Sequence, residues 1–158
     1  MPERLRRLET IFVDNPIYFL TACTAARRRA LANNEIHRAF REFAIGGENI
    51  GAFVGSYILM PDHLHLFVAV DVEKIPLSQW VKSLKGALSK RLRLSGHKSP
   101  FWQKGFFDHI LRSSDSYAAK WEYVRQNAVR AGFVSDWQHW PYVGEIFSLE
   151  YRRDVRRL

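Results

Sequence analysis

The feature that most constrains the fold is a long, largely apolar stretch from Ile50 to Val70, broken in its middle by Pro61 and Asp62. Residues on both sides of the break are rich in the β-branched and aromatic types that favour strands. Proline followed by aspartate is typical of a turn. The spacing therefore predicts a hairpin, with one strand inside 50–60 and the next beginning at the turn, and so an antiparallel sheet.

Strands and helices of mixed order surround this hairpin. The periodicity predicts a strand over Ile17–Cys23 after Asn15-Pro16, a helix over 27–43 ended by Gly46-Gly47, a helix over about 77–94, and a strand over 106–112. Ser113 to Ser116 offer N-caps for a third helix, which Gly132 closes. We therefore expect an α+β fold with a ferredoxin-like antiparallel sheet, helices packed mainly on one face, and the other face open.

The length and composition are those of one well-packed domain. The chain has 158 residues, of which 47% are hydrophobic and 14% aromatic. We expect a single domain over 1–158, with a core over about 17–134 and a basic C-terminal extension over 135–158. A lone cysteine, Cys23, cannot form an intrachain disulfide. With no apolar run near the roughly 20 residues of a membrane span and no signal-peptide core, we expect a cytoplasmic protein without a membrane partner.

A strongly basic balance points to a polyanionic partner. The formal net charge is +8, and arginines gather at 4–7, 27–29 and 152–157. Nucleic acid is the first candidate and an anionic membrane surface the second. The candidate DNA-contacting residues are two arginines of the second cluster and a basic flank of the second helix, although a solvated face explains each of them as well: Arg27, Arg28, Lys82, Lys85, Lys90 and Arg93.

Two histidines, His63 and His65, lie one residue apart in the second strand of the hairpin. Side chains alternate between the faces of a strand, so the two imidazoles point the same way while Leu64 and Leu66 turn into the core. Neighbouring imidazoles on a rigid strand are natural ligands for a divalent metal. For this spacing alone, two half-exposed histidines on a polar face are an equally good interpretation.

The third helix carries a tyrosine and an asparagine four residues apart. Tyr123 and Asn127 would share one helix face, about a quarter turn from the core-facing stripe that includes Tyr117. Both side chains would then be presented to a neighbouring site. The alternative is that Tyr123 is a boundary aromatic residue whose hydroxyl is simply hydrogen-bonded.

Three ordered blocks of sequence resemble one family. The segment from Met60 to His65 is similar to the His-hydrophobic-His motif of single-tyrosine transposases. Phe101-Trp102-Gln103 with 106–112 resembles the Trp-Gln…Phe-x-Asp-His-x-x-Arg block of REP-associated tyrosine transposases, and 123–132 resembles their Tyr-Ile-x-x-Asn-Pro-Val-x-Ala-Gly segment. One departure is Ala128, where the family usually has proline.

The resemblance implies a DNA strand-transfer enzyme. By position, Tyr123 would be the nucleophile that cleaves and rejoins single-stranded DNA next to hairpins, through a 5′-phosphotyrosine. His63, His65 and Asn127 would hold Mg²⁺ or Mn²⁺, although Zn²⁺, Ni²⁺ or Co²⁺ would bind two imidazoles more tightly in a purified sample.

Two other functions stay open at this point. One is a domesticated, non-catalytic binder of REP-like DNA hairpins, and the other is a metal-dependent nuclease in which water attacks. For the strand-transfer enzyme and for the domesticated binder, the expected partner is single-stranded or hairpin DNA. The sequence leaves both a monomer and a homodimer open, and it gives no role for His109.

Overall fold

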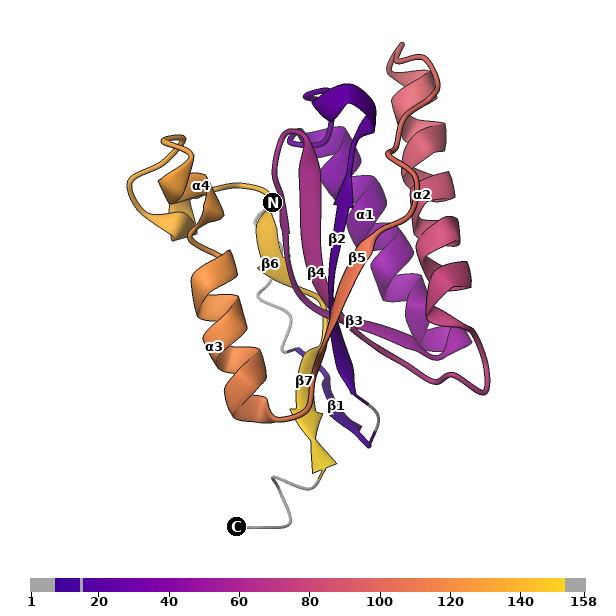
Figure 1. The fold of residues 1–158 in the computed structure, drawn as a ribbon, viewed down its shortest axis with the longest axis vertical. Coiled ribbons are helices and arrows are strands. Elements are labelled where there is room, and N and C mark those ends of the chain that lie inside the picture. The colour runs from indigo at the N-terminus through magenta and orange to yellow at the C-terminus, as the bar shows by residue number, and fades with distance from the viewer. Residues whose placement is uncertain (1–7, 15, 153–158) are drawn as a thin grey trace.

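The computed structural model describes residues 8–14 and 16–152, and its centre is a five-stranded antiparallel sheet. The strands lie in the order β5-β2-β4-β3-β6, and a separate parallel pair joins β1 to β7 (Figure 1). The elements in chain order are β1 (Thr10–Val13), β2 (Ile17–Cys23), α1 (Asn34–Gly46), β3 (Ala52–Leu59), β4 (His63–Val70), α2 (Leu77–Leu94), β5 (Phe107–Leu111), α3 (Ser114–Val124), α4 (Asn127–Arg130), β6 (Val143–Glu145) and β7 (Ser148–Tyr151).

Helices α1 and α2 lie side by side on one face of the sheet, and α3 lies on the opposite face (Figure 1). Leu64 and Leu66 of β4 are fully buried. The buried residues of α1, including Ile36 and Phe40, recur at helical spacing, and α2 buries one stripe in the same way. The Phe40 ring lies 4.6 Å from the ring of Tyr57 on β3. The α+β fold class expected from the sequence is confirmed.

The opposite face is partly covered rather than fully open, because α3 packs on it. The Tyr117 ring lies 4.6 Å from the Phe67 ring of β4, and Trp121 meets the same ring edge-on at 6.0 Å. The Tyr117 hydroxyl accepts from the Ser56 backbone N–H at 2.9 Å and donates to the Ser56 hydroxyl at 3.0 Å. Gly55 permits this approach, since a Cβ there would lie 2.5 Å from the Tyr117 oxygen. A few specific contacts therefore dock α3.

The first helix begins later than the sequence predicted. Helix α1 starts at Asn34, not at Arg27, because Ala26 and Arg27 adopt left-handed conformations with φ of 54° and 53°. The side chain of Asn33 then accepts from the Ile36 backbone N–H at 3.0 Å and caps the helix. Periodicity could not locate this start because the capping geometry lies outside the apolar repeat.

The third helix is also shorter than predicted. It ends at Val124, and a separate turn, α4, begins at Asn127. At the break the Gln126 N–H bonds to the Tyr123 carbonyl, three residues back, and the Asn127 side chain bonds to the Val124 carbonyl. Gly132, with φ of +80°, closes the segment as expected.

The last described residues add strands to both sheets. Strand β6 pairs with β3 as an edge strand, and β7 pairs with β1, where Arg152 forms an ion pair with Asp14 at 3.1 Å. The arginines at 4–7 and 153–157 lie outside the described residues. Among the helices that the structure describes, none is long and apolar enough to cross a membrane.

Candidate active site

His63 and His65 lie side by side at the first end of β4, on the face where α3 packs. Their ring centroids are 4.8 Å apart, at an interplanar angle of 74°. Strand β2 pairs Cys23 with His63 and Thr21 with His65, which fixes both imidazoles on this face. The alternation of β4 therefore produces the pair of rings that the sequence predicted.

Each imidazole is held from behind through its Nδ1 atom. His63 Nδ1 lies 2.8 Å from the Asp62 carboxylate, and His65 Nδ1 lies 2.8 Å from the Thr21 hydroxyl. Arg27 in turn donates from Nε to Asp62 at 2.9 Å. Partners on Nδ1 are typical of metal-binding histidines, because they fix the ring and leave Nε2 to face the metal. The arrangement would suit the two Nε2 atoms as ligands.

The electrostatics keep His65 neutral. Burial is the main cause that lowers the pKa of His65 to about 3, and the charges of His63, Lys120, Arg130 and Arg27 contribute to that shift in the same direction. A neutral imidazole at pH 7 has a free lone pair for a metal. Burial alone would raise the pKa of Asp62, but its contacts with His63 and Arg27 lower it overall, so this carboxylate is charged beside His63.

Tyr123 lies at the end of α3 and is 62% exposed. The Arg130 guanidinium lies 4.1 Å from the centre of this ring, and Lys120 Nζ lies 5.9 Å from it. The same Lys120 Nζ is 4.7 Å from the Phe19 ring, which stacks on His65 at 5.2 Å. A continuous set of contacts therefore links the tyrosine to the histidine pair within one chain.

The Asn127 side chain is hydrogen-bonded to the end of α3. Its side-chain N–H donates to the Val124 carbonyl at 2.9 Å, and within residues 8–14 and 16–152 no hydrogen bond joins it to either histidine. The same described residues bring together no group of three or more His, Cys, Asp or Glu side chains that could hold a metal. Among the described residues, a third protein ligand beside the histidines would be of another type, such as an amide oxygen.

The basic residues singled out in the sequence do not form one surface. Arg27 lies at the site through Asp62, whereas Arg28 donates to the Lys98 carbonyl at 2.7 Å. Lys85 donates to the carbonyls of Gln103 and Gly105 at 3.1 and 2.5 Å, and so holds the loop before β5.

The other three basic residues lie on α2, across the sheet from α3 (Figure 1). Lys82 and Lys90 are exposed there, and the Arg93 guanidinium lies 5.4 Å from the centre of the Phe101 ring. Sequence analysis missed Lys120 and Arg130, which are the basic residues beside Tyr123. The available signal was their spacing: Lys120 precedes Tyr123 by three residues and Arg130 follows it by seven, which on a predicted helix favours positions near the tyrosine.

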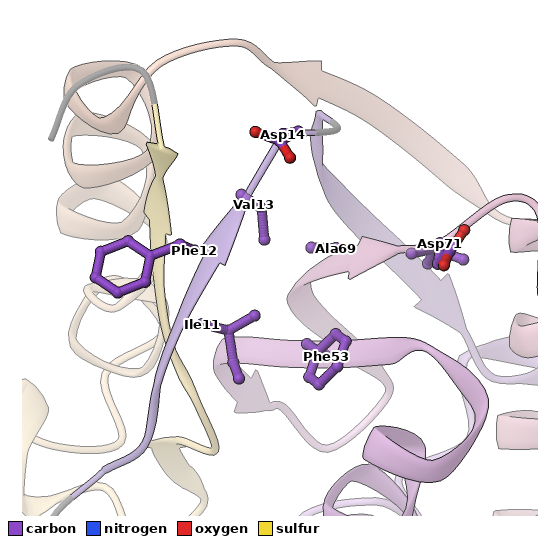
Figure 2. A pocket seen from close by; sticks show the side chains of 8 residues that line it. Ile11, Phe12, Val13, Asp14, Phe53, Ala69 and Asp71 are labelled. Carbon is purple, nitrogen blue, oxygen red and sulfur yellow. The ribbon is translucent and has the colours of Figure 1, made fainter. Parts of the chain in front are cut away.

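A pocket of about 170 Å³ lies at the other end of β4, away from the histidines (Figure 2). Ile11, Phe53 and Ala69 line it, with Asp14 and Asp71 at its rim. Ala69 is six residues along β4 from His63, so this hollow is separate from the candidate active site.

Comparison with known proteins gives one consistent result. The sequence model of the family described as "Transposase IS200 like" matches residues 13–127, most of the chain. A REP-associated tyrosine transposase of Escherichia coli K12 is 21% identical, over 92% of this chain and 82% of its own length. A Haemophilus influenzae protein, provisionally given the same name, is 23% identical over 92% of this chain and 85% of its own.

A solved structure has the same fold. It is a REP-associated tyrosine transposase bound to a REP hairpin, with a TM-score of 0.66 and 20% identity over 98% of this chain and 86% of its own. These findings confirm the resemblance that the sequence motifs indicated, and the chain belongs to the IS200-like transposase family.

Proposed function

We propose that this protein cleaves and rejoins single-stranded DNA next to hairpins, with Tyr123 as the nucleophile. The observation that carries the proposal is the pair of imidazoles, His63 and His65, with both Nδ1 atoms bonded and with Lys120 shared between Phe19 and Tyr123. A fixed ligand pair, linked through Phe19 and Lys120 to an exposed phenol, suits metal-assisted phosphoryl transfer to a tyrosine. The similarity to a transposase bound to a REP hairpin supports hairpin DNA as the substrate class.

His63 and His65 would hold a divalent metal through Nε2, with Asn127 as third ligand through its amide oxygen. The donor set fits, since both imidazoles are oriented and the Asn127 N–H is already bonded to Val124, which leaves its oxygen for a cation. Mg²⁺ or Mn²⁺ would polarise the scissile phosphate as a Lewis acid and leave room for water.

The chemical step exchanges one phosphoester for another. The Tyr123 oxygen forms a bond to phosphorus and loses its proton, while the bond from phosphorus to the 3′ oxygen breaks and that oxygen takes up a proton. The products are a 5′-phosphotyrosine and a free 3′-hydroxyl. Rejoining reverses the exchange, so no nucleoside triphosphate is consumed. Lys120 and Arg130, both beside the Tyr123 ring, place positive charge where the phosphate would approach.

The test is incubation with labelled hairpin DNA that carries single-stranded flanks, with Mg²⁺ or Mn²⁺, followed by a denaturing gel and mass spectrometry. A set of hairpins of varied sequence is used, and EDTA serves as the metal-free control. We expect a DNA adduct on Tyr123 that EDTA abolishes. Cleavage without an adduct would contradict the nucleophile and favour attack by water.

The metal ligands have their own test. Asn127→Ala should weaken Mn²⁺ binding, measured by titration calorimetry, by less than His63→Ala does, because an amide is the weaker ligand. An unchanged affinity in the Asn127 variant would remove it from the ligand set.

A second candidate function is hairpin binding without turnover. One observation favours it: next to Asn127, Ala128 stands where the family usually has proline. Hairpin binding with neither cleavage nor adduct, across the same set of substrates and metals, would select this function.

A further inference from the structure

Strand β5 presents an unusually exposed aromatic side chain at the edge of the central sheet. Phe107 is 73% exposed, the largest exposed fraction among the large hydrophobic residues that the structure describes. Its neighbour Phe106 packs against the core instead. Removing a phenylalanine ring from water is favourable, so a ligand that covers an exposed ring gains binding free energy. Phe107, on a rigid strand, is available for such a contact.

Phe107 lies on the same face as the candidate active site. Directly paired residues of antiparallel strands point to the same side, and β5 pairs Phe107 with Thr21 while β4 pairs Thr21 with His65. The hydrogen bond from Thr21 to His65 Nδ1 places these two side chains together on that face. One row across three strands therefore runs from His65 through Thr21 to Phe107.

Positive charge surrounds the inner end of this row. Arg27 donates to Asp62, which bonds to His63. Lys120 Nζ lies 4.7 Å from the Phe19 ring that stacks on His65. A phosphate attracted by these cations would stand two strand spacings, about 10 Å, from Phe107. Phe107 is thus about one nucleotide away from a phosphate at the histidines, and it offers an apolar face where the cations offer charge.

We propose that Phe107 is a stacking platform for an unpaired DNA base next to the phosphate held at the histidine pair. The inference rests on the proposed function, and it adds a base-contacting residue to the phosphate-contacting residues. Stacking on an exposed aromatic ring tolerates every base, since each base has a π-face. Phe107 would therefore fix the path of the flanking single strand without reading its sequence.

The experiment compares two strands of equal charge. The probes are fluorescein-labelled oligo-dT and an abasic strand with the same number of phosphates, and anisotropy is measured in EDTA so that no cleavage occurs. Phe107→Ala should weaken oligo-dT binding about fivefold to tenfold and leave the abasic strand unchanged. Phe107→Tyr, which keeps an aromatic face, should bind oligo-dT as the unmodified protein does.

Phe12→Ala is the matched control, because Phe12 is also an exposed phenylalanine on a strand but lies beside the pocket at the far end of β4. It should change neither affinity. Because Phe107 is mostly exposed, its removal should leave the thermal unfolding midpoint within a few degrees, and circular dichroism checks this. Equal losses on both strands, or no loss on oligo-dT, would overturn the stacking platform.

The two proposals fail in different ways. If no adduct ever forms on Tyr123 while Phe107→Ala still weakens oligo-dT binding selectively, the strand-transfer function fails and the platform stands. If the adduct forms and the Phe107 variant binds both probes normally, the platform alone is wrong.

Discussion

The two faces of the central sheet differ in what they bury and in how they are held. On the α1 and α2 face, β4 contributes Leu64 and Leu66, which are fully buried. On the α3 face the alternate residues of the same strand are His63 and His65, which remain partly accessible. One strand thus supplies a core on one side and candidate ligands on the other.

A small domain can in this way keep potentially reactive side chains on one face of a strand whose other face is packed in the core. Apolar packing behind β4 fixes the backbone, so the imidazoles need few contacts of their own to stay in place. Helix α3, by contrast, contacts the sheet through side chains that include Tyr117, Trp121 and Lys120. We expect substitutions on the α1 and α2 face, called the packed face below, to reduce stability. Substitutions at the histidines and at Tyr123 should instead reduce activity.

The largest expected effect is on the α3 face. Tyr123→Phe should remove the DNA adduct to below detection, because no hydroxyl remains to attack phosphorus, and His63→Ala should abolish cleavage by removing a metal ligand. Both variants should unfold in urea at the midpoint of the unmodified protein. His139→Ala, which removes an exposed histidine outside the strands, is the control and should stay active. A destabilised His63 variant would show that this histidine is structural.

On the packed face the effect should be on stability. Leu66→Ala should lower the free energy of unfolding by about 2–5 kcal/mol, since it leaves a cavity behind β4. Urea denaturation followed by circular dichroism measures this. If the loss were below 1 kcal/mol, the contrast between the two faces would be broken.

The contact between α3 and the sheet should affect both stability and activity. Gly55→Ala places a methyl group against the Tyr117 oxygen and Leu149, which should cost about 1–3 kcal/mol. Because α3 also carries Tyr123, adduct formation should fall as well, at a temperature where the variant is folded. Gly86→Ala, at a position where a Cβ meets nothing within 4 Å, is the control. If the Gly55 variant were destabilised but formed the adduct as the unmodified protein does, the contact between α3 and the sheet would not be needed for activity.

The smallest expected effect concerns a histidine on the packed face. The Tyr57 oxygen accepts from Arg41 and lies 2.7 Å from His37 Nε2, and burial together with Arg41 lowers the pKa of His37 to about 4. A base with a lowered folded-state pKa stabilises the fold above about pH 6.5, and that stability is lost as pH falls toward 4. In His37→Gln the drop in unfolding free energy between pH 7 and 4 should be smaller. An equal drop in both proteins would contradict the assignment.

Much of the fold could be predicted because its signals are local. The hairpin turn at Pro61, strand β2 and helix α2 follow from apolar periodicity and turn residues, and the structure places them where the sequence did. Capping and left-handed residues moved the start of α1, because those features depend on backbone geometry at 26–33 rather than on the apolar repeat.

That His63 and His65 share a face could be predicted from the residue order, because side-chain alternation is a property of any strand. The sequence by itself also placed Tyr123 in a helix and indicated the family resemblance. Three relations depend on the tertiary structure. Thr21 bonds to His65, 44 residues away, and Lys120 lies against both Phe19 and Tyr123. Phe107 pairs with Thr21 and so joins the same row. These relations depend on strand register and helix docking, which pair residues far apart in the chain and leave no periodic trace in it.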